Sequence, residues 1–204
     1  AMAALGGGPA EAPAAPSCPL EARAAAIIRK ARRLPSAVLV DLDYTCWPFW
    51  LNAHAQGPPF RQHQDGVTVV DRRGRQVEMY PEAPAVLSAL HAAGVPLVAC
   101  SRSDIPEWCR AVSDLYVISP ASGLRFRDAL HPASVIRPAE SKLKHLREIQ
   151  AALGLPFCEL LFFDDERRIC REGESLGVQT VCVEDTGLNL AALEKGLASF
   201  GSRL

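Results

Sequence analysis

An apolar run that ends abruptly in two carboxylates constrains the fold of this chain most. Val38, Leu39 and Val40 are followed at once by Asp41 and then, past one residue, by Asp43. A continuous run of branched apolar residues is typical of a strand that is buried on both faces of a parallel sheet. Open α/β sheets bind their ligands at the carboxyl ends of such strands. We therefore expect both carboxylates at the mouth of a binding site.

Two carboxylates so close together need a partner for their charge. They repel each other unless a cation or a shared proton relieves the repulsion, and a hard cation such as Mg2+ prefers oxygen ligands of this kind. The alternative is a helix N-cap or a turn after the strand, which is the commoner role of a single Asp. The pairing of Asp41 with Asp43, followed by Thr45, favours a site of chemistry.

Strand and helix patterns alternate from Pro35 onward. Glycines at positions 94, 154 and 177 follow helical stretches, as the residue just past a helix end often does. This alternation predicts an α/β fold, a doubly wound parallel sheet with right-handed crossovers. The predicted strands are 37–40, 95–100, 115–118, 160–163 and 179–183, and the predicted helices are 21–33, 82–93, 104–112, 139–153, 166–176 and 189–200.

Polar side chains close three of these strands. Asp41 ends the first, Ser101 follows the second, and the pair Asp164 and Asp165 follows the strand at 160–163. Because the carboxyl ends of parallel strands meet at one edge of the sheet, we expect these residues to converge although they lie far apart in the chain.

The order of these motifs resembles the haloacid dehalogenase (HAD) superfamily of aspartyl-phosphate hydrolases. Four dispersed elements identify that superfamily, and here they match Asp41 to Thr45, Ser101, Lys142 and the pair Asp164-Asp165. The stretches DLDYTCWPFW and FFDDERR resemble its small magnesium-dependent phosphatases in particular. The likeness covers about 35–200, and it implies an HAD-like Rossmannoid fold, Mg2+ as cofactor and hydrolysis of phosphate monoesters.

The resemblance also implies a role for each matching residue. Asp41 would attack phosphorus and form an aspartyl phosphate, while Asp43 would protonate the leaving oxygen and later activate the hydrolytic water. Asp41 and the main-chain carbonyl of Asp43 would hold the metal. Asp165 is favoured as a further direct ligand, with Asp164 ligating the ion or orienting Asp165. The phosphate would be bound by Ser101, Lys142, Arg102 and the backbone N–H groups around Leu42 and Arg102.

Each element also has a purely structural alternative. Ser101 is equally well placed to cap a helix, and Asp164 and Asp165 could begin a helix with favourable charge. Lys144 competes with Lys142 for the role of the cation. The joint occurrence of these residues at the ends of the predicted elements favours the catalytic interpretation.

The segment between the first two motifs is too short for a helical cap domain. It contains strand-like runs at 68–70 and 76–79, joined by the basic turn 71–75, and so predicts a small β-hairpin flap at about 66–80. Because so small a flap leaves the site open, the site admits a phosphate on a protein as well as one on a sugar.

Three aromatic residues follow the first motif closely. Trp47, Phe49 and Trp50 either form a rim that accepts an aryl or sugar ring, or fill the gap under the hairpin. The sequence leaves both interpretations open.

Composition argues against several classes of binding partner. A net charge of −1 over 204 residues gives no general attraction to nucleic acid or membrane, and no apolar stretch approaches the roughly 20 residues of a membrane span.

Residues 1–19 are rich in Ala, Gly and Pro and are predicted to be disordered, which leaves 20–204 for the domain. Seven scattered cysteines indicate free thiols in a reducing compartment. We expect a cytoplasmic monomer, with a weak organelle address still open.

The predicted function is therefore a phosphatase that acts on a phosphorylated small molecule or a phosphoprotein, and the resemblance points to phosphotyrosine or sugar phosphates. The alternative is a phosphoprotein-binding module with little turnover, which would not need both carboxylates. A cysteine phosphatase is excluded because no Cys has an Arg six positions later. A dehalogenase would have no need for a carboxylate at position 43.

Overall fold

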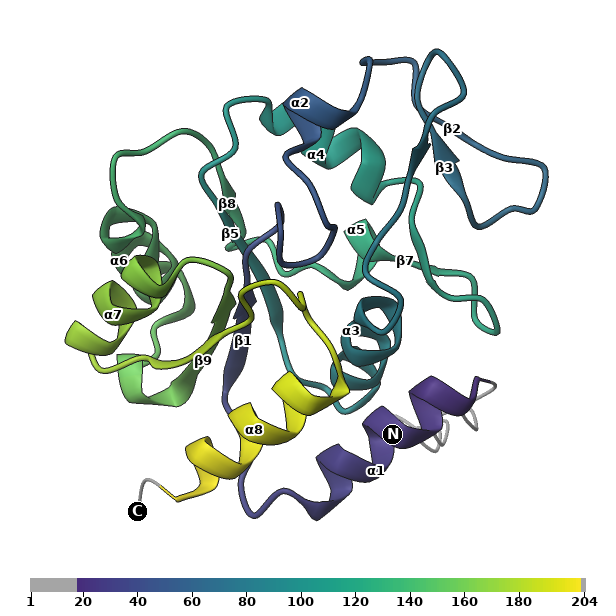
Figure 1. Ribbon diagram of the computed structural model, residues 1–204. Helices are drawn as coiled ribbons and strands as arrows, with labels where there is room; N and C mark the ends of the chain where they lie inside the picture. The colour runs from purple at the N-terminus through teal and green to yellow at the C-terminus, as the bar shows by residue number, and fades with distance from the viewer. Residues whose placement is uncertain (1–17, 203–204) are drawn as a thin grey trace, which may run out of the picture.

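A computed structural model describes residues 18–202 of the chain (Figure 1). At its centre lies a five-stranded sheet in the order β10-β9-β1-β5-β8, with every neighbouring pair parallel. The strands are β1 (Ala37–Val40), β5 (Leu97–Ser101), β8 (Val135–Ile136), β9 (Leu160–Asp164) and β10 (Gln179–Cys182). The predicted α/β fold with a parallel sheet is confirmed.

Helices cover both faces of this sheet. Residues that alternate along β1 face opposite sides, so Val38 packs in one apolar core and Leu39 in the other. The first core is covered by α1 (Pro19–Lys30), α3 (Ala83–Ala92) and α8 (Leu190–Gly201), and the second by α6 (Lys142–Leu153) and α7 (Arg167–Ser175). Because both faces are buried, each central strand reads as a continuous apolar run, as the sequence predicts.

The predicted strand at 115–118 does not join this sheet. Its residues contribute to β6 (Val117–Ser119), which pairs antiparallel with β7 (Leu124–Arg125) in a separate ribbon that packs on α3. The edge position beside β5 is taken by β8, where Cys100 pairs with Val135. A strand as short as β8 carries too little apolar pattern to be found in the sequence.

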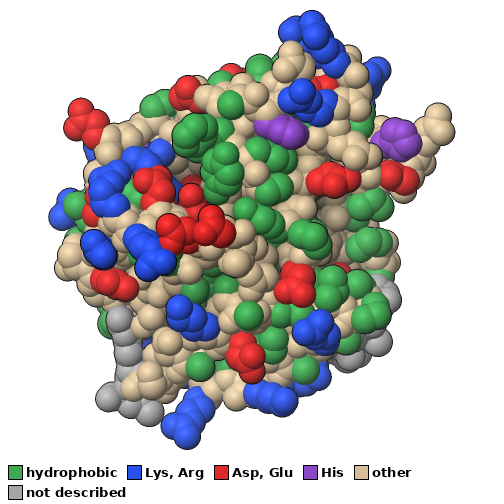
Figure 2. Space-filling model, viewed as in Figure 1, with side chains coloured by type: hydrophobic (Ala, Val, Ile, Leu, Met, Phe, Trp, Pro, Cys, Tyr) green, Lys and Arg blue, Asp and Glu red, His purple; other side chains and the backbone are tan. Residues whose placement is uncertain are grey.

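The flap is a three-stranded antiparallel sheet made of β2 (Arg61–Gln62), β3 (Val69–Val70) and β4 (Gln76–Val77). The hairpin β3–β4 lies where the sequence predicts it, and β2 is an addition. The buried carboxylate of Asp71 fixes the turn, because it accepts the backbone N–H groups of Gln56, Arg73 and Arg75 at 2.8, 2.8 and 3.0 Å. Basic side chains gather at the upper right of Figure 2, where Figure 1 draws the flap.

The remaining described elements are short helices. They are α2 (Leu51–His54), α4 (Pro106–Ser113), α5 (Phe126–Ala129) and the 3-10 helix η1 (Phe157–Glu159). Of the segment predicted to be disordered, residues 1–17 lie outside the described part, and Pro19 is already the first residue of α1. Among the described helices, none is long and apolar enough to cross a bilayer.

Candidate active site

The polar residues predicted at strand ends do meet at one edge of the sheet. Asp41 follows β1 directly, and its N–H donates to the carbonyl of Phe163 in β9 at 3.0 Å. Ser101 and Asp164 are the last residues of β5 and β9. The chain then turns sharply after Asp41, because the carbonyl of Leu42 accepts backbone N–H groups from the three residues 45–47.

Lys142 is the cation of this site. It is the first residue of α6 and only 1% exposed, and its Nζ lies 2.6 Å from Oδ1 of Asp41 and 2.5 Å from Oδ2 of Asp164. Burial acts to lower the pKa of Lys142, but the two carboxylates outweigh it and raise the pKa above its usual value. The side chain therefore stays an ammonium, whereas the competing Lys144 is exposed outside this cavity.

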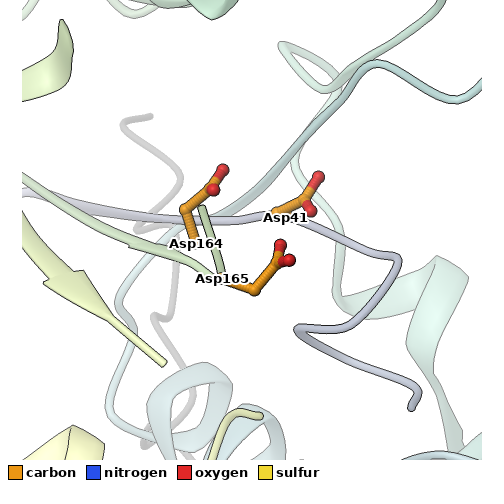
Figure 3. Close-up of side chains that lie close together, drawn as sticks. All are labelled: Asp41, Asp164 and Asp165. Atoms are coloured by element: carbon orange, nitrogen blue, oxygen red, sulfur yellow. The ribbon is translucent and has the colours of Figure 1, made fainter. Parts of the chain in front are cut away.

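Three carboxylates form a compact acidic group beside that ammonium. Asp41, Asp164 and Asp165 offer oxygens that all lie within 4.8 Å of one another (Figure 3). Both oxygens of Asp164 are engaged, because Oδ2 pairs with Lys142 and Oδ1 accepts the backbone N–H of Glu166 at 2.9 Å. The carboxylate of Asp165, by contrast, has no hydrogen-bond or ion-pair partner on any other residue of the described part, although its backbone carbonyl accepts the thiol of Cys182 at 3.3 Å.

Asp165 is thus the carboxylate that still needs a positive charge. Burial raises its pKa to about 6, and the negative charge of Asp41 adds to the shift. A partly buried carboxylate next to another carboxylate is stabilised by a hard cation with oxygen ligands. The donor set of Asp41 and Asp165 fits Mg2+ on this ground.

Asp43 points toward the same cavity from a different environment. Its Oδ1 accepts the indole N–H of Trp47 at 2.5 Å and the backbone N–H of Leu51 at 3.2 Å. Burial raises the pKa of Asp43 to about 6 against the effect of the Trp47 hydrogen bond, and the charge of Asp41 raises it further. A carboxyl group whose pKa is raised toward neutral pH is suited to act as a general acid and then as a general base.

One cavity of about 660 Å3 collects most of the predicted residues. Asp41, Asp43, Ser101, Arg102, Lys142 and Asp165 line it, whereas Leu42 and Asp164 do not. Ser101 does not cap α4, whose N-cap is Ile105; its Oγ accepts the N–H of Ser103 at 3.2 Å. The guanidinium of Arg102, expected to contact phosphate, is instead paired with Glu166, a residue to which the sequence pattern assigns no role.

The aromatic cluster after the first motif divides between core and rim. Trp47 and Phe49 are buried, as the packing interpretation predicts. Trp50 is 60% exposed at the cavity mouth, where its ring meets that of Tyr44 edge to face at 5.7 Å. Tyr44 lies at this rim as well, although the sequence pattern does not mark it; it has a positive φ of 55° and is 38% exposed.

Fold and site together define a class: a doubly wound α/β protein with a lysine-bridged acidic site at the carboxyl edge of its sheet. A family model described as acid phosphatase matches residues 33–203. Magnesium-dependent phosphatase 1 of Homo sapiens is 41% identical over 168 residues, which are 82% of this chain and 88% of that protein. The chain therefore belongs to the acid phosphatase family, and the resemblance seen in its motifs is confirmed.

Two further likenesses accompany these matches. A HAD-like hydrolase superfamily protein of Schizosaccharomyces pombe is 32% identical over 145 residues, 71% of this chain and 83% of that protein. A solved phosphatase domain from Bacteroides fragilis, complexed with Mg, aligns with a TM-score of 0.48 at 16% identity and covers 86% of this chain and 40% of that chain.

Proposed function

We propose that the chain is a Mg2+-dependent phosphatase that hydrolyses phosphate monoesters through an aspartyl phosphate on Asp41. The observation that carries the proposal is the buried ammonium of Lys142 between Asp41 and Asp164, close to the carboxylate of Asp165, which forms no ion pair within the described residues. The name of the human relative, a magnesium-dependent phosphatase, supports it. Such hydrolysis is among the slowest uncatalysed reactions, and it demands charge neutralisation and alignment of nucleophile and leaving group.

The first step uses Asp41 as the nucleophile. Lys142 engages its Oδ1, so Oδ2 is the oxygen that attacks phosphorus. As the new O–P bond forms, the bond from phosphorus to the leaving oxygen breaks, and Asp43 gives that oxygen its proton. Ser101 donates its hydroxyl to a phosphoryl oxygen, together with the N–H groups of Leu42 and Arg102.

The second step returns the enzyme to its starting state. Asp43, now ionised, takes a proton from water, whose oxygen bonds to phosphorus while the bond to Asp41 breaks. Asp41, Asp165 and the main-chain carbonyl of Asp43 would hold Mg2+, and Asp164 orients Lys142 beside them. The bound ion would neutralise charge on the phosphoryl oxygens.

The aromatic rim supports a ring on the leaving side of the phosphate. Trp50 and Tyr44 expose apolar faces at the mouth of the cavity that contains Asp41 and Asp43. Aromatic faces of this kind pack against aryl or sugar rings. We propose aryl phosphates such as phosphotyrosine, or phosphorylated sugars, as the substrate class.

Trapping of the intermediate tests this function. Borohydride reduction of an aspartyl phosphate, after mixing with nitrophenyl phosphate and Mg2+, converts the modified residue to homoserine, which peptide mass spectrometry locates. We expect the change at position 41, and we expect Asp41→Asn to lose both the label and turnover because an amide does not attack phosphorus.

The control variant is Asp114→Asn, which alters a carboxylate paired with Arg127 outside the cavity and should keep both signals. Appreciable turnover by pure Asp41→Asn contradicts the mechanism. Tight binding of a phosphotyrosine peptide by the unaltered chain without any turnover would instead favour a binding module.

A further inference from the structure

The carboxyl group of Asp43 is held on one side only. Trp47 Nε1 and the backbone N–H of Leu51 both donate to its Oδ1, at 2.5 and 3.2 Å. Within the described residues no hydrogen bond reaches Oδ2, although Asp43 lines the cavity. Two donors on one oxygen and none on the other make the two oxygens chemically different.

This asymmetry decides where a proton can reside. An indole N–H is a donor and never an acceptor, and the same holds for a backbone N–H. An oxygen that accepts two such bonds is poorly placed to carry a proton as well. The acidic hydrogen of Asp43 is therefore confined to Oδ2, the oxygen without a protein donor.

The indole of Trp47 is itself held firmly. Its side chain is fully buried and stacks on Tyr116, with ring centroids 6.0 Å apart and an interplanar angle of 30°. The hydroxyl of Tyr116 donates in turn to the carbonyl of Val77, in strand β4 of the flap, at 2.9 Å. The direction of the indole N–H is thus set by packing between the core and the flap, and not by a free rotamer.

We propose that Trp47 is a positioning residue for the reaction: its indole N–H holds Asp43 Oδ1 so that Oδ2 presents the proton to the leaving oxygen. The inference rests on the proposed function, in which Asp43 is the acid. General acids must lie within hydrogen-bond reach of the atom that they protonate. A carboxyl group that rotates away from this direction would deliver its proton poorly.

A residue that only fills the core makes a different prediction. Loss of packing lowers stability and slows every substrate alike, since nucleophile, lysine and acid all loosen together. Loss of acid positioning slows most those substrates whose leaving group needs a proton. Nitrophenolate leaves with little protonation, whereas an alkyl or sugar oxygen needs it.

The experiment compares kcat/KM for nitrophenyl phosphate with kcat/KM for a sugar phosphate. Two changes at position 47 remove the N–H: Trp47→Phe, and incorporation of benzothienylalanine, which keeps the size of the indole and replaces its N–H by sulfur. Trp108→Phe is the matched control, because Trp108 packs on Phe60 and does not line the cavity. Thermal denaturation of each variant shows how much folded protein is present.

We expect both changes at position 47 to lower kcat/KM for the sugar phosphate by about 10-fold to 100-fold, a part of what general acid catalysis contributes. The loss for nitrophenyl phosphate should be less than about 3-fold. Trp108→Phe should leave the ratio of the two constants unchanged. Equal losses on both substrates with the benzothienylalanine protein would overturn the proposal.

Asp43→Asn separates failure of this inference from failure of the proposed function. If Asp43→Asn shows the selective loss on the sugar phosphate and the variants at position 47 do not, Trp47 has no positioning role. If Asp43→Asn itself loses both activities equally, Asp43 is not the acid, and the inference fails together with that part of the mechanism.

Discussion

Replacement of Lys142 by methionine tests whether the lysine charge stabilises the buried carboxylates of the site. Methionine has nearly the length of lysine without its charge, so Lys142→Met removes the ammonium that lies 2.6 Å from Asp41 and 2.5 Å from Asp164. The carboxylates then remain buried without their cation. Removing one partner of a buried ion pair lowers the free energy of unfolding by about 3–5 kcal/mol.

The lower end of that range applies here, because the pKa of Asp164 is already raised by burial and the group can take up a proton in compensation. For a domain of this size each kcal/mol corresponds to roughly 2–4 °C, so a loss of about 3 kcal/mol lowers Tm by about 6–12 °C. Scanning calorimetry in a chelating buffer measures this shift.

Measurements with added metal and with a control variant test whether the lost charge causes the lower Tm. Added Mg2+ should recover part of the lost Tm in Lys142→Met, since a cation beside Asp165 relieves the same repulsion. Lys144→Met alters an exposed side chain outside the cavity and should change Tm by less than about 1 °C. A Lys142→Met protein that melts within about 1 °C of wild type in chelator would refute the assignment of Lys142 as the compensating charge.

Two further predictions concern ions and protons. Ca2+ should compete with Mg2+ and inhibit hydrolysis of nitrophenyl phosphate, because it tolerates bidentate carboxylates and can capture both oxygens of Asp41; full activity with Ca2+ alone would contradict this. His145 is fully buried, and burial lowers its pKa from 6.5 to about 4, with Arg137, Lys142 and Arg102 adding to the shift and Glu148 opposing it. Its folded pKa lies below the unfolded one, so its contribution to stability is complete above about pH 6.5 and is lost progressively as pH falls toward 4. Urea unfolding should show wild type losing up to about 3 kcal/mol more than His145→Leu between pH 7 and 4, and parallel curves would count against it.

Local pattern was enough to predict four of the five strands of the central sheet and the polar residues at its edge. The apolar runs before Asp41, Ser101 and Asp164 each indicate, within a few residues, a strand that is buried on both faces of the sheet. Because parallel strands share one carboxyl edge, knowing which strands end in polar residues already predicts that these residues meet. The choice of phosphate chemistry came from the order of the four motifs.

Contacts between segments that are distant in the sequence decided which of the candidate side chains are buried and which are exposed. Lys142 and Lys144 carry the same side chain, but the packing of α6 against β5 and α7 buries Lys142 and leaves Lys144 exposed. Likewise Trp47 and Trp50 differ in role because Tyr116 and the flap enclose the first ring and leave the second at the cavity mouth. Burial depends on what the rest of the chain places nearby, and that information is absent from any short stretch of sequence.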